Sequence, residues 1–275
     1  MKTEAVLVTV AGLADALASG AQLLDVRWEL GEQPGSGFAR YLDGHVPGAR
    51  FLDLEAVLTG PASDPLLGRH PLPDAAQLGA GLGALGVDPS RPLIVYDEPG
   101  SFAAGRAWWV LRWAGLDARV LDGGLRAWRD AGRPLATDEP PTVPGDPLEL
   151  SVGHLPTLDA AGVAAFDGVL IDVRAAPRFR GEVEPIDASA GHIPGAVNRP
   201  VTGFFTATGT LPAAADLVAE LDLPPGREVA VYCGSGVSAA QAVLALHSIG
   251  VPAALYPASW SGWSADPARP VAVGA

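Results

Sequence analysis

The sequence predicts an α/β protein made of two tandem copies of one unit, each a parallel sheet flanked by helices. Two observations predict this architecture. Motifs near the start of the chain recur in the same order in its second half, and short apolar runs alternate with helix-like runs throughout. Runs rich in Val, Ile and Leu between helical patterns are typical of parallel strands buried on both faces. Such sheets place their functional loops at the carboxyl ends of the strands.

Two pairs of motifs reveal the repeat. The stretch QLLDVR at 22–27 recurs as VLIDVR at 169–174, and GHVPGA at 44–49 recurs as GHIPGA at 191–196. The second motif follows the first at the same distance in both copies. Several matches in one order indicate a duplicated unit. The histidine of the GH-[VI]-PGA motif occurs in both copies, so we expect it to be structural.

Each copy continues with a strand, a helix and a further strand. The expected strands LIVYD (93–97) and VAVYC (229–233) precede the helix-like runs AAGRAWWVLRWAG and GVSAAQAVLALHSIG. Each helix leads to another strand candidate, ARVLDGG or AALYPAS, and Trp128 and Trp263 follow at matching places. Both copies therefore show the alternation that a parallel sheet requires.

A proline-rich stretch separates the two copies. Residues 137–150 read TDEPPTVPGDPLEL, and prolines favour extended backbone that suits a linker. We therefore expect an N-terminal domain over 1–136, a linker over 137–150 and a C-terminal, catalytic domain over 151–275.

Composition limits the classes of function. The chain has 275 residues, 48% of them hydrophobic, and a net charge of −13, whereas a nucleic-acid-binding surface needs clustered positive charge. No apolar stretch approaches the length of a membrane span, and the apolar run in MKTEAVLVTVAG is too weak for a signal peptide. One cysteine allows neither an intramolecular disulfide nor an all-cysteine zinc site. We expect a soluble, cytoplasmic protein that binds no nucleic acid and no membrane.

The only cysteine, Cys233, is expected on a turn between a strand and a helix, within VYCGSGVSAA. The first copy has Asp97 at this place, so only the second copy can do thiol chemistry. Gly234 and Gly236 let backbone N–H groups turn toward the sulfur, and the helix expected from Val237 directs its positive end there. Both features favour a reactive thiolate. A buried, inert cysteine is the alternative.

The residues around Cys233 narrow the chemistry. There is no second cysteine for a dithiol redox site. A cysteine phosphatase would need arginine at position 239, which is alanine, and the loop lies near no histidine in sequence that would suit a cysteine protease. A cradle of amides around a sulfur anion instead indicates a thiol that carries sulfur as a persulfide.

These motifs resemble a known family. The D-V-R and G-H-I-P-G-A motifs, the cysteine loop and the stretch LDGGLRAW are similar to those of tandem-domain rhodanese-type sulfurtransferases. The loop C-G-S-G-V-S resembles the 3-mercaptopyruvate sulfurtransferase branch, whereas thiosulfate enzymes of this type carry basic residues after the cysteine. The resemblance implies two rhodanese-like domains, the first without a catalytic cysteine, and a ping-pong reaction without cofactor or metal. Cys233 would take sulfur from a small-molecule donor and pass it to a thiol acceptor such as thioredoxin, or to cyanide.

The resemblance also implies how the donor is bound. Arg178 matches an arginine that holds the donor's carboxylate, a role that suits the planar guanidinium. The family's second arginine has no counterpart, because Ile186 and Asp187 stand there, and Arg180 is a nearby substitute. The residues expected to bind the substrate are Arg178, Gly234, Gly236, Val237 and Ser238.

Three residues are expected to join Cys233 in catalysis by moving protons. Ser235 matches a loop serine of the mercaptopyruvate branch, and His70, in GRHPLPD, matches a histidine that the first domain contributes. Glu55, in FLDLEA, aligns with the acidic partner, and Asp53 is the nearby alternative. A serine, a histidine and an acid can relay a proton. For His70, packing within a loop is the alternative.

Three other functions stay open. Transfer of sulfur from thiosulfate to cyanide would use the same cysteine with another donor. A non-catalytic persulfide carrier would need the cysteine but not the donor site. A purely structural tandem protein would need neither, and the intact cysteine loop argues against it.

Overall fold

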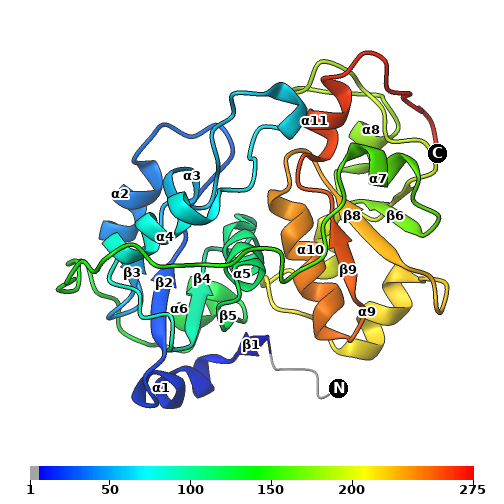
Figure 1. Ribbon diagram of the computed structural model, residues 1–275. Coiled ribbons are helices and arrows are strands. Elements are labelled where there is room, and N and C mark those ends of the chain that lie inside the picture. Colours follow the sequence, from blue (N-terminus) through cyan, green and yellow to red (C-terminus); the bar gives the residue numbers. More distant parts are fainter. Residues whose placement is uncertain (1–5) are drawn as a thin grey trace. The chain divides into compact units, whose positions relative to one another are not determined.

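The structure, a computed structural model, describes residues 6–275 (Figure 1). The chain forms two compact units. The first unit comprises Met1–Gly60, Pro73–His154 and Ala207–Leu211, and the second comprises Pro61–Leu72, Leu155–Thr206 and Pro212–Ala275. Relative to the predicted domains 1–136 and 151–275, two short segments are exchanged, and the first unit also includes the predicted linker 137–150 and residues 151–154. The second unit includes Pro61–Leu72, because helix α11 (Ser259–Ser264) contacts the short helix η1 (Pro65–Leu67).

The first unit contains a five-stranded parallel sheet in the order β1-β5-β4-β2-β3. Its strands are β1 (Leu7–Val8), β2 (Gln22–Asp25), β3 (Arg50–Phe51), β4 (Leu93–Tyr96) and β5 (Ala118–Leu121). Its helices are α1 (Val10–Ala18), α2 (Ser36–Asp43), α3 (Leu54–Val57), α4 (Ala75–Ala84), α5 (Ala103–Trp113) and α6 (Gly124–Asp130).

The second unit contains a four-stranded parallel sheet in the order β7-β6-β8-β9. Its strands are β6 (Val169–Asp172), β7 (Val197–Asn198), β8 (Val229–Tyr232) and β9 (Ala253–Leu255). Besides η1 and α11, its helices are α7 (Ala160–Ala164), α8 (Ala176–Phe179), η2 (Val201–Phe204), α9 (Ala214–Leu221) and α10 (Val237–Ser248). Two parallel sheets flanked by helices confirm the predicted fold class.

The central strands are apolar because both faces of each sheet are covered. Every residue of β2, β4 and β8 is buried, as expected of parallel strands between layers of helices. In the second unit, α10 packs on β8 and β9, and in the first, α5 packs on β4 and β5. The helix-like runs predicted after each central strand are thus helices in contact with that strand.

The register of the two sheets places the D-V-R motif of each copy next to the end of its central strand. Asp25 pairs with Tyr96 between β2 and β4, and Asp172 pairs with Tyr232 between β6 and β8. The residue after each tyrosine therefore leaves the carboxyl end of its sheet beside the D-V-R motif. In the second unit that residue is Cys233, which places the thiol where parallel sheets carry their functional loops.

The repeated motifs make structural contacts within each unit. In D-V-R, the carboxylate of Asp172 accepts a hydrogen bond of 2.6 Å from Arg174, and the guanidinium lies 4.6 Å above the ring of Trp260. In the GH-[VI]-PGA motif, Nδ1 of His192 is 2.8 Å from the carbonyl of Phe179, and His45 makes the matching contact in the first unit. Both histidines act structurally, as their presence in both copies indicated.

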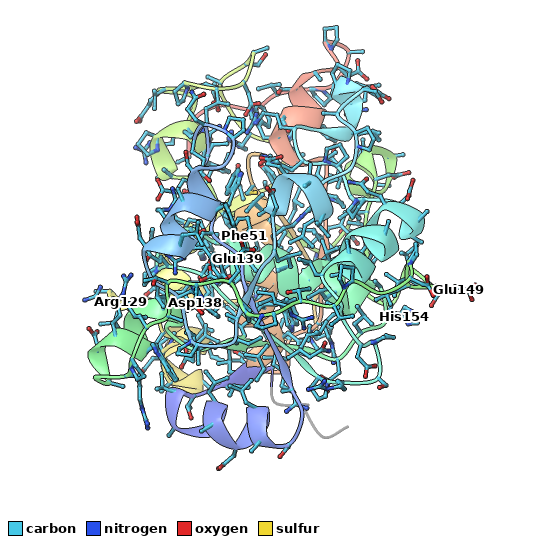
Figure 2. The ribbon with its side chains drawn as sticks, turned by 90° about the vertical axis from the view of Figure 1, so that its left-hand side faces the viewer. Phe51, Arg129, Asp138, Glu139, Glu149 and His154 are labelled. Carbon is cyan, nitrogen blue, oxygen red and sulfur yellow. The ribbon has the colours of Figure 1, made fainter. Side chains whose placement is uncertain are left out.

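Residues 137–150 contain no helix and no strand. The amide of Gly145 donates a hydrogen bond of 2.9 Å to the carbonyl of Gly83 in α4. A Cβ at Gly83 would lie 2.3 Å from a carbonyl oxygen of this stretch, so the glycine lets the backbone approach the helix closely. Asp138 and Glu139, labelled in Figure 2, are exposed.

Candidate functional site

Cys233 lies in the loop between β8 and α10. Its sulfur accepts a hydrogen bond of 3.1 Å from the amide of Gly236, whose φ of +85° lets the loop curl around the thiol. The side chain of Cys233 is 2% exposed. Helix α10 begins at Val237, with Ser238 half-buried behind it. The strand, turn and helix thus follow the predicted order, and one loop amide is directed at the sulfur.

Ser259 supports the same loop from α11, and the sequence reasoning missed it. Its hydroxyl accepts a hydrogen bond of 3.1 Å from the amide of Cys233, donates one of 2.9 Å to the carbonyl of Tyr256, and lies 4.0 Å from the thiol sulfur. Ser259 has a φ of +52°, in the left-handed region that non-glycine residues rarely adopt. Backbone strain of this kind tends to occur at functional sites.

A signal for Ser259 exists in the comparison of the two copies. The amide of Leu125 bonds the carbonyl of Asp97 at 2.9 Å, and the amide of Trp260 bonds that of Cys233 at 2.9 Å, so the two contacts are equivalent. The residue before Leu125 is Gly124, with a φ of +56°. The first copy therefore has glycine where the cysteine-containing copy has a serine in the same unusual conformation.

Ser235 and His70 are in direct contact. Nδ1 of His70 is 2.7 Å from the hydroxyl oxygen of Ser235, and both side chains are buried. The sequence predicted that His70 comes from the first domain. The structure differs, because His70 lies in Pro61–Leu72 and so belongs to the same compact unit as Ser235.

Glu55, the predicted acidic partner, lies on α3 in the first unit. Its carboxylate accepts a hydrogen bond of 2.8 Å from the indole nitrogen of Trp28. The alternative acid, Asp53, is the N-cap of α3 and accepts a bond of 3.0 Å from the amide of Ala56. Asp53 therefore caps the helix and Glu55 bonds Trp28, and a catalytic role of Glu55 stays a prediction.

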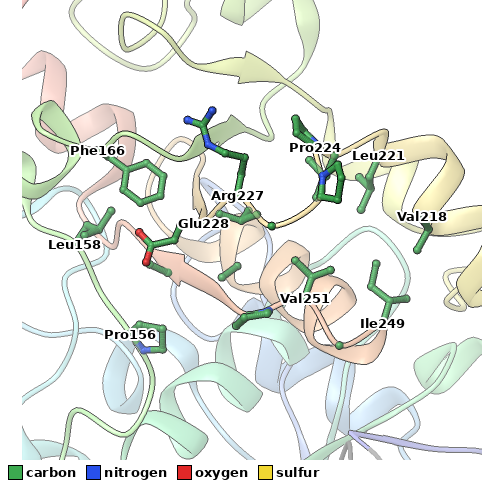
Figure 3. Close-up of a pocket in the computed structure, with 18 of the residues that line it drawn as sticks. Pro156, Leu158, Phe166, Val218, Leu221, Pro224, Arg227, Glu228, Ile249 and Val251 are labelled. Carbon is green, nitrogen blue, oxygen red and sulfur yellow. The ribbon is translucent and has the colours of Figure 1, made fainter.

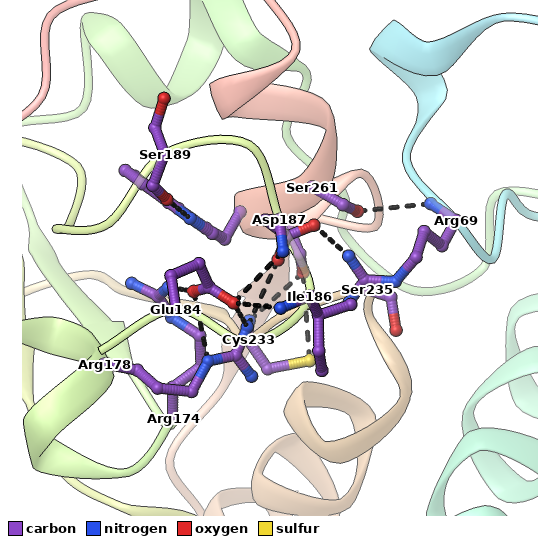
Figure 4. A network of polar contacts seen from close by, with 12 residues as sticks. Arg69, Arg174, Arg178, Glu184, Ile186, Asp187, Ser189, Cys233, Ser235 and Ser261 are labelled. Atoms are coloured by element: carbon purple, nitrogen blue, oxygen red, sulfur yellow. Dashed lines mark hydrogen bonds and ion pairs between the residues drawn. The ribbon is translucent and has the colours of Figure 1, made fainter. Parts of the chain in front are cut away.

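Four charged side chains form a network next to the cysteine loop (Figure 4). Arg178 donates two hydrogen bonds to Glu184, of 2.6 and 3.1 Å, and lies 3.2 Å from Asp187. Asp187 also accepts a hydrogen bond from Arg69. Asp187 thus links two guanidinium groups that come from distant parts of the sequence. Arg180, the proposed substitute for the missing arginine, instead pairs with Glu182 at 2.6 Å.

The pKa values of Asp187 and Glu184 are shifted in opposite directions. Burial raises the pKa of Asp187 above its ordinary value, and the positive charge of Arg69 only partly opposes this. Burial would also raise the pKa of Glu184, but hydrogen bonds from Arg178 and from two backbone amides outweigh it and lower that pKa. Glu184 is therefore a firmly ionised partner of Arg178, whereas Asp187 is the carboxylate that gives up its charge more easily.

Gly234 is where this network meets the loop. A Cβ at Gly234 would lie 3.1 Å from Nη2 of Arg69 and 3.6 Å from Nη1 of Arg178. A Cβ here would require Arg69 to shift by a few tenths of an ångström, whereas its distance to Arg178 is an ordinary van der Waals contact. The glycine therefore lets the guanidinium of Arg69 approach the residue next to Cys233. Of the residues expected to bind the substrate, Arg178 and Gly234 are thus brought together with the thiol.

A cavity of about 800 Å³ lies elsewhere in the second unit (Figure 3). Its lining is largely apolar and includes Phe166, Pro224, and the first residues of β8 and β9, Val229 and Ala253. Cys233 follows the opposite, carboxyl end of β8, so the cavity is at the other end of the sheet. None of the predicted site residues lines it.

No cluster of three or more His, Cys, Asp or Glu side chains in residues 6–275 could hold a metal ion. No helix within this range is both long enough and apolar enough to cross a membrane.

Comparison with known proteins gives consistent matches over nearly the whole chain. A family model described as rhodanese-like domain matches residues 9–131 and again 158–266. SseB of Mycobacterium tuberculosis, named as a thiosulfate sulfurtransferase, is 45% identical over 98% of this chain and 97% of its own length. A Pseudomonas aeruginosa protein named as a 3-mercaptopyruvate sulfurtransferase is 44% identical over 99% of both chains. The structure of SseA from Escherichia coli, described as a 3-mercaptopyruvate sulfotransferase, superposes with a TM-score of 0.81 at 32% identity, covering 93% of this chain and 99% of that one.

Proposed function

The chain belongs to the rhodanese family and is a sulfurtransferase, and we propose that it takes sulfur from 3-mercaptopyruvate. In this proposal Cys233 holds the sulfur as a persulfide and passes it to a thiol acceptor such as thioredoxin, or to cyanide in an assay. The observation that carries the choice of donor is the 2.7 Å contact between His70 and Ser235 in the cysteine loop.

The chemistry of the donor explains why this contact matters. The Cys233 thiolate attacks the sulfur of 3-mercaptopyruvate, an S–S bond forms, and the donor's C–S bond breaks with its electron pair going to carbon. The leaving group is the enolate of pyruvate, which must gain a proton to become pyruvate. The proton of the donor's thiol balances this step and leaves an ionised persulfide. In this proposal Ser235 and His70 carry that proton.

Thiosulfate is the second candidate donor, and a different observation supports it. Attack of the Cys233 thiolate on its outer sulfur releases sulfite, a stable anion that needs no proton. Thiosulfate is a dianion, and two guanidinium groups, Arg69 and Arg178, lie beside Gly234. The name of the SseB relative points to the same donor.

A comparison of donors tests the proposal. We expect kcat/KM with 3-mercaptopyruvate to exceed that with thiosulfate when both are measured at one fixed cyanide concentration. A larger kcat/KM with thiosulfate would overturn the choice of donor. Persulfide formation without turnover on either donor would instead identify a persulfide carrier.

The remaining parts of the proposal concern cofactor and compartment. The reaction moves sulfur between a donor, a thiol and an acceptor, so it requires no cofactor. A lone catalytic thiol and a thiol acceptor suit a reducing compartment, and we therefore place the protein in the cytoplasm. The net charge of −13 argues against a nucleic-acid partner.

A further inference from the structure

The apolar cavity of the second unit has the size of a small-molecule site (Figure 3). Its volume of about 800 Å³ lies within the range of about 300–1,000 Å³ that is usual for ligand pockets. Residues 223–228, before β8, and 249–252, before β9, supply much of its lining. A ligand held there would not occupy the site of a sulfur donor, because Cys233 follows the opposite end of β8.

The cavity wall is rigid and offers few backbone donors. Four prolines line it, namely Pro156, Pro224, Pro225 and Pro252. Proline fixes the backbone angle φ and has no N–H group. The three amides of the turn 249–251 already bond carbonyls at the end of α10. A ligand that must accept hydrogen bonds therefore finds few partners in this wall, whereas a ligand that only donates them loses nothing.

Two charged side chains line the cavity, and only one of them is already paired. Arg227 donates a hydrogen bond to the carbonyl of Asp167 and lies 3.6 Å from the carboxylate of the same residue. The carboxylate of Glu228 forms no hydrogen bond and no ion pair with any residue of 6–275. The uncommitted charge of the lining is therefore negative.

An aromatic ring lies next to Glu228. A Cβ at Gly168 would be 2.3 Å from Cζ of Phe166 and 2.4 Å from the carbonyl oxygen of Glu228, so both residues pack against the same glycine. In Figure 3 the carboxylate of Glu228 is directed toward Phe166 and Leu158, and the guanidinium of Arg227 points in another direction. A carboxylate beside an aromatic ring suits an organic ammonium group, which is attracted both to the charge and to the ring face.

From these observations we propose that the cavity binds an organic cation, a molecule with an apolar body and a single ammonium group. The body occupies the apolar lining, and the ammonium group lies beside Glu228 and Phe166. An apolar carboxylate would bring a second negative charge to Glu228 while Arg227 is paired with Asp167. The proposal adds a binding site to the protein and does not depend on the sulfur donor or on Cys233.

Three probes that share one apolar body test the proposal. At neutral pH 4-phenylbutylamine is a cation, 4-phenylbutan-1-ol is neutral and 4-phenylbutyrate is an anion. Titration of the full chain, followed by the NMR shifts of its backbone amides, gives both the Kd of each probe and the residues affected. We expect the shifts to be concentrated at the cavity lining. The amine should bind about 3–10-fold more tightly than the alcohol, and the carboxylate should bind most weakly.

Substitutions of Glu228 test the source of this preference. In Glu228→Gln the Kd of the amine should rise to that of the alcohol, while the Kd of the alcohol stays within about twofold. Glu228→Lys should reverse the order, so that 4-phenylbutyrate binds best. Glu149→Gln is the matched control, because it removes the same charge from an exposed glutamate of the first unit. It should leave all three affinities unchanged.

Three results would overturn the proposal. One is equal binding of the amine and the alcohol to the unmodified protein, and another is a preference for the amine that survives in Glu228→Gln. The third is the absence of shifts at the cavity lining with every probe up to its solubility limit. None of these measurements involves sulfur transfer, so failure of this proposal leaves the proposed function standing, and failure of the proposed function leaves the cavity site standing.

Discussion

The imidazole of His70 and the hydroxyl of Ser235 are 2.7 Å apart, although 165 residues separate them in the sequence. If this pair carries the proton that pyruvate needs, His70→Ala should lower kcat with 3-mercaptopyruvate by about 100-fold, the usual contribution of a positioned acid or base. With thiosulfate the loss should be much smaller, since sulfite needs no proton. Steady-state kinetics with both donors check this, and equal losses would assign His70 to packing of the loop.

Cys233→Ser should abolish transfer from every donor, because Cys233 is the only cysteine in the sequence. The fold should remain, since a hydroxyl can still accept the bond from Gly236. Mass spectrometry of the unmodified protein after exposure to donor alone should show one added sulfur on this residue. Turnover above background in the pure variant would contradict the assignment.

Arg178→Ala should lower kcat/KM for 3-mercaptopyruvate by about 10–100-fold, because a hydrogen bond to a charged group contributes about 1.5–3 kcal/mol. Arg178→Lys should recover only part of this, since a point charge lacks the two-pronged geometry. The rate of alkylation by uncharged iodoacetamide is the control and should change little. If that rate falls as much as kcat/KM, Arg178 supports the loop and does not hold the donor.

Ser259 combines a structural hydrogen bond with an unusual backbone conformation, and two substitutions separate these effects. Ser259→Ala and Ser259→Gly both leave the amide of Cys233 without its acceptor, which costs about 1–3 kcal/mol of unfolding free energy. Glycine adopts a φ of +52° without strain, so Ser259→Gly should be about 1 kcal/mol more stable than Ser259→Ala. Urea unfolding measures the difference. Equal stability of the two variants would show that the conformation is not strained.

Asp97, at the place of the thiol in the first unit, should make stability depend on pH. Burial raises its pKa to about 7, although the amide of Ala104 partly opposes the shift. The folded state then holds its proton more tightly than the unfolded state, so its contribution to stability is fully present below about pH 4. That contribution is lost as the pH rises through about 7.

Asp97→Asn should remove this dependence, since asparagine keeps the size and can still accept the bond from Ala104. Relative to the unmodified protein, the variant should gain stability as the pH rises from 4 to 7. Urea unfolding at several pH values gives the difference between the two proteins. A difference that does not vary with pH would show that Asp97 is ionised throughout that range.

The duplicated motifs allowed much of the fold to be predicted. Asp25 and Asp172 mark equivalent strands, and the rule that parallel strands carry functional loops at their carboxyl ends predicts the position of Cys233. Local turn chemistry likewise predicted the positive φ of Gly236, but Gly234, expected to turn in the same way, does not have a positive φ. These features depend on short stretches of sequence and on the pairing of buried apolar strands. Both can be recognised from a single amino-acid sequence.

The surroundings of Cys233 were harder to predict because they depend on contacts distant in sequence. Arg69 has no motif that marks it as a neighbour of Gly234, and Arg180 was as reasonable a candidate. That His70 belongs to the second unit follows from packing of η1 on α11, which no local pattern encodes. Ser259 was missed although its counterpart Gly124 signals the required backbone conformation.

The exchange of short segments between the two units affects how the protein is made. The amide of Leu211 bonds Asp122 at 3.0 Å, so the first unit gains its last piece only after about half of the second half of the chain has been translated. In return, Pro61–Leu72 leaves the ribosome early and must wait for α11, near the end of the chain. Folding during synthesis therefore cannot finish one unit before starting the other. Splitting the gene at residues 137–150 would put Cys233 on one product and both His70 and Arg69 on the other.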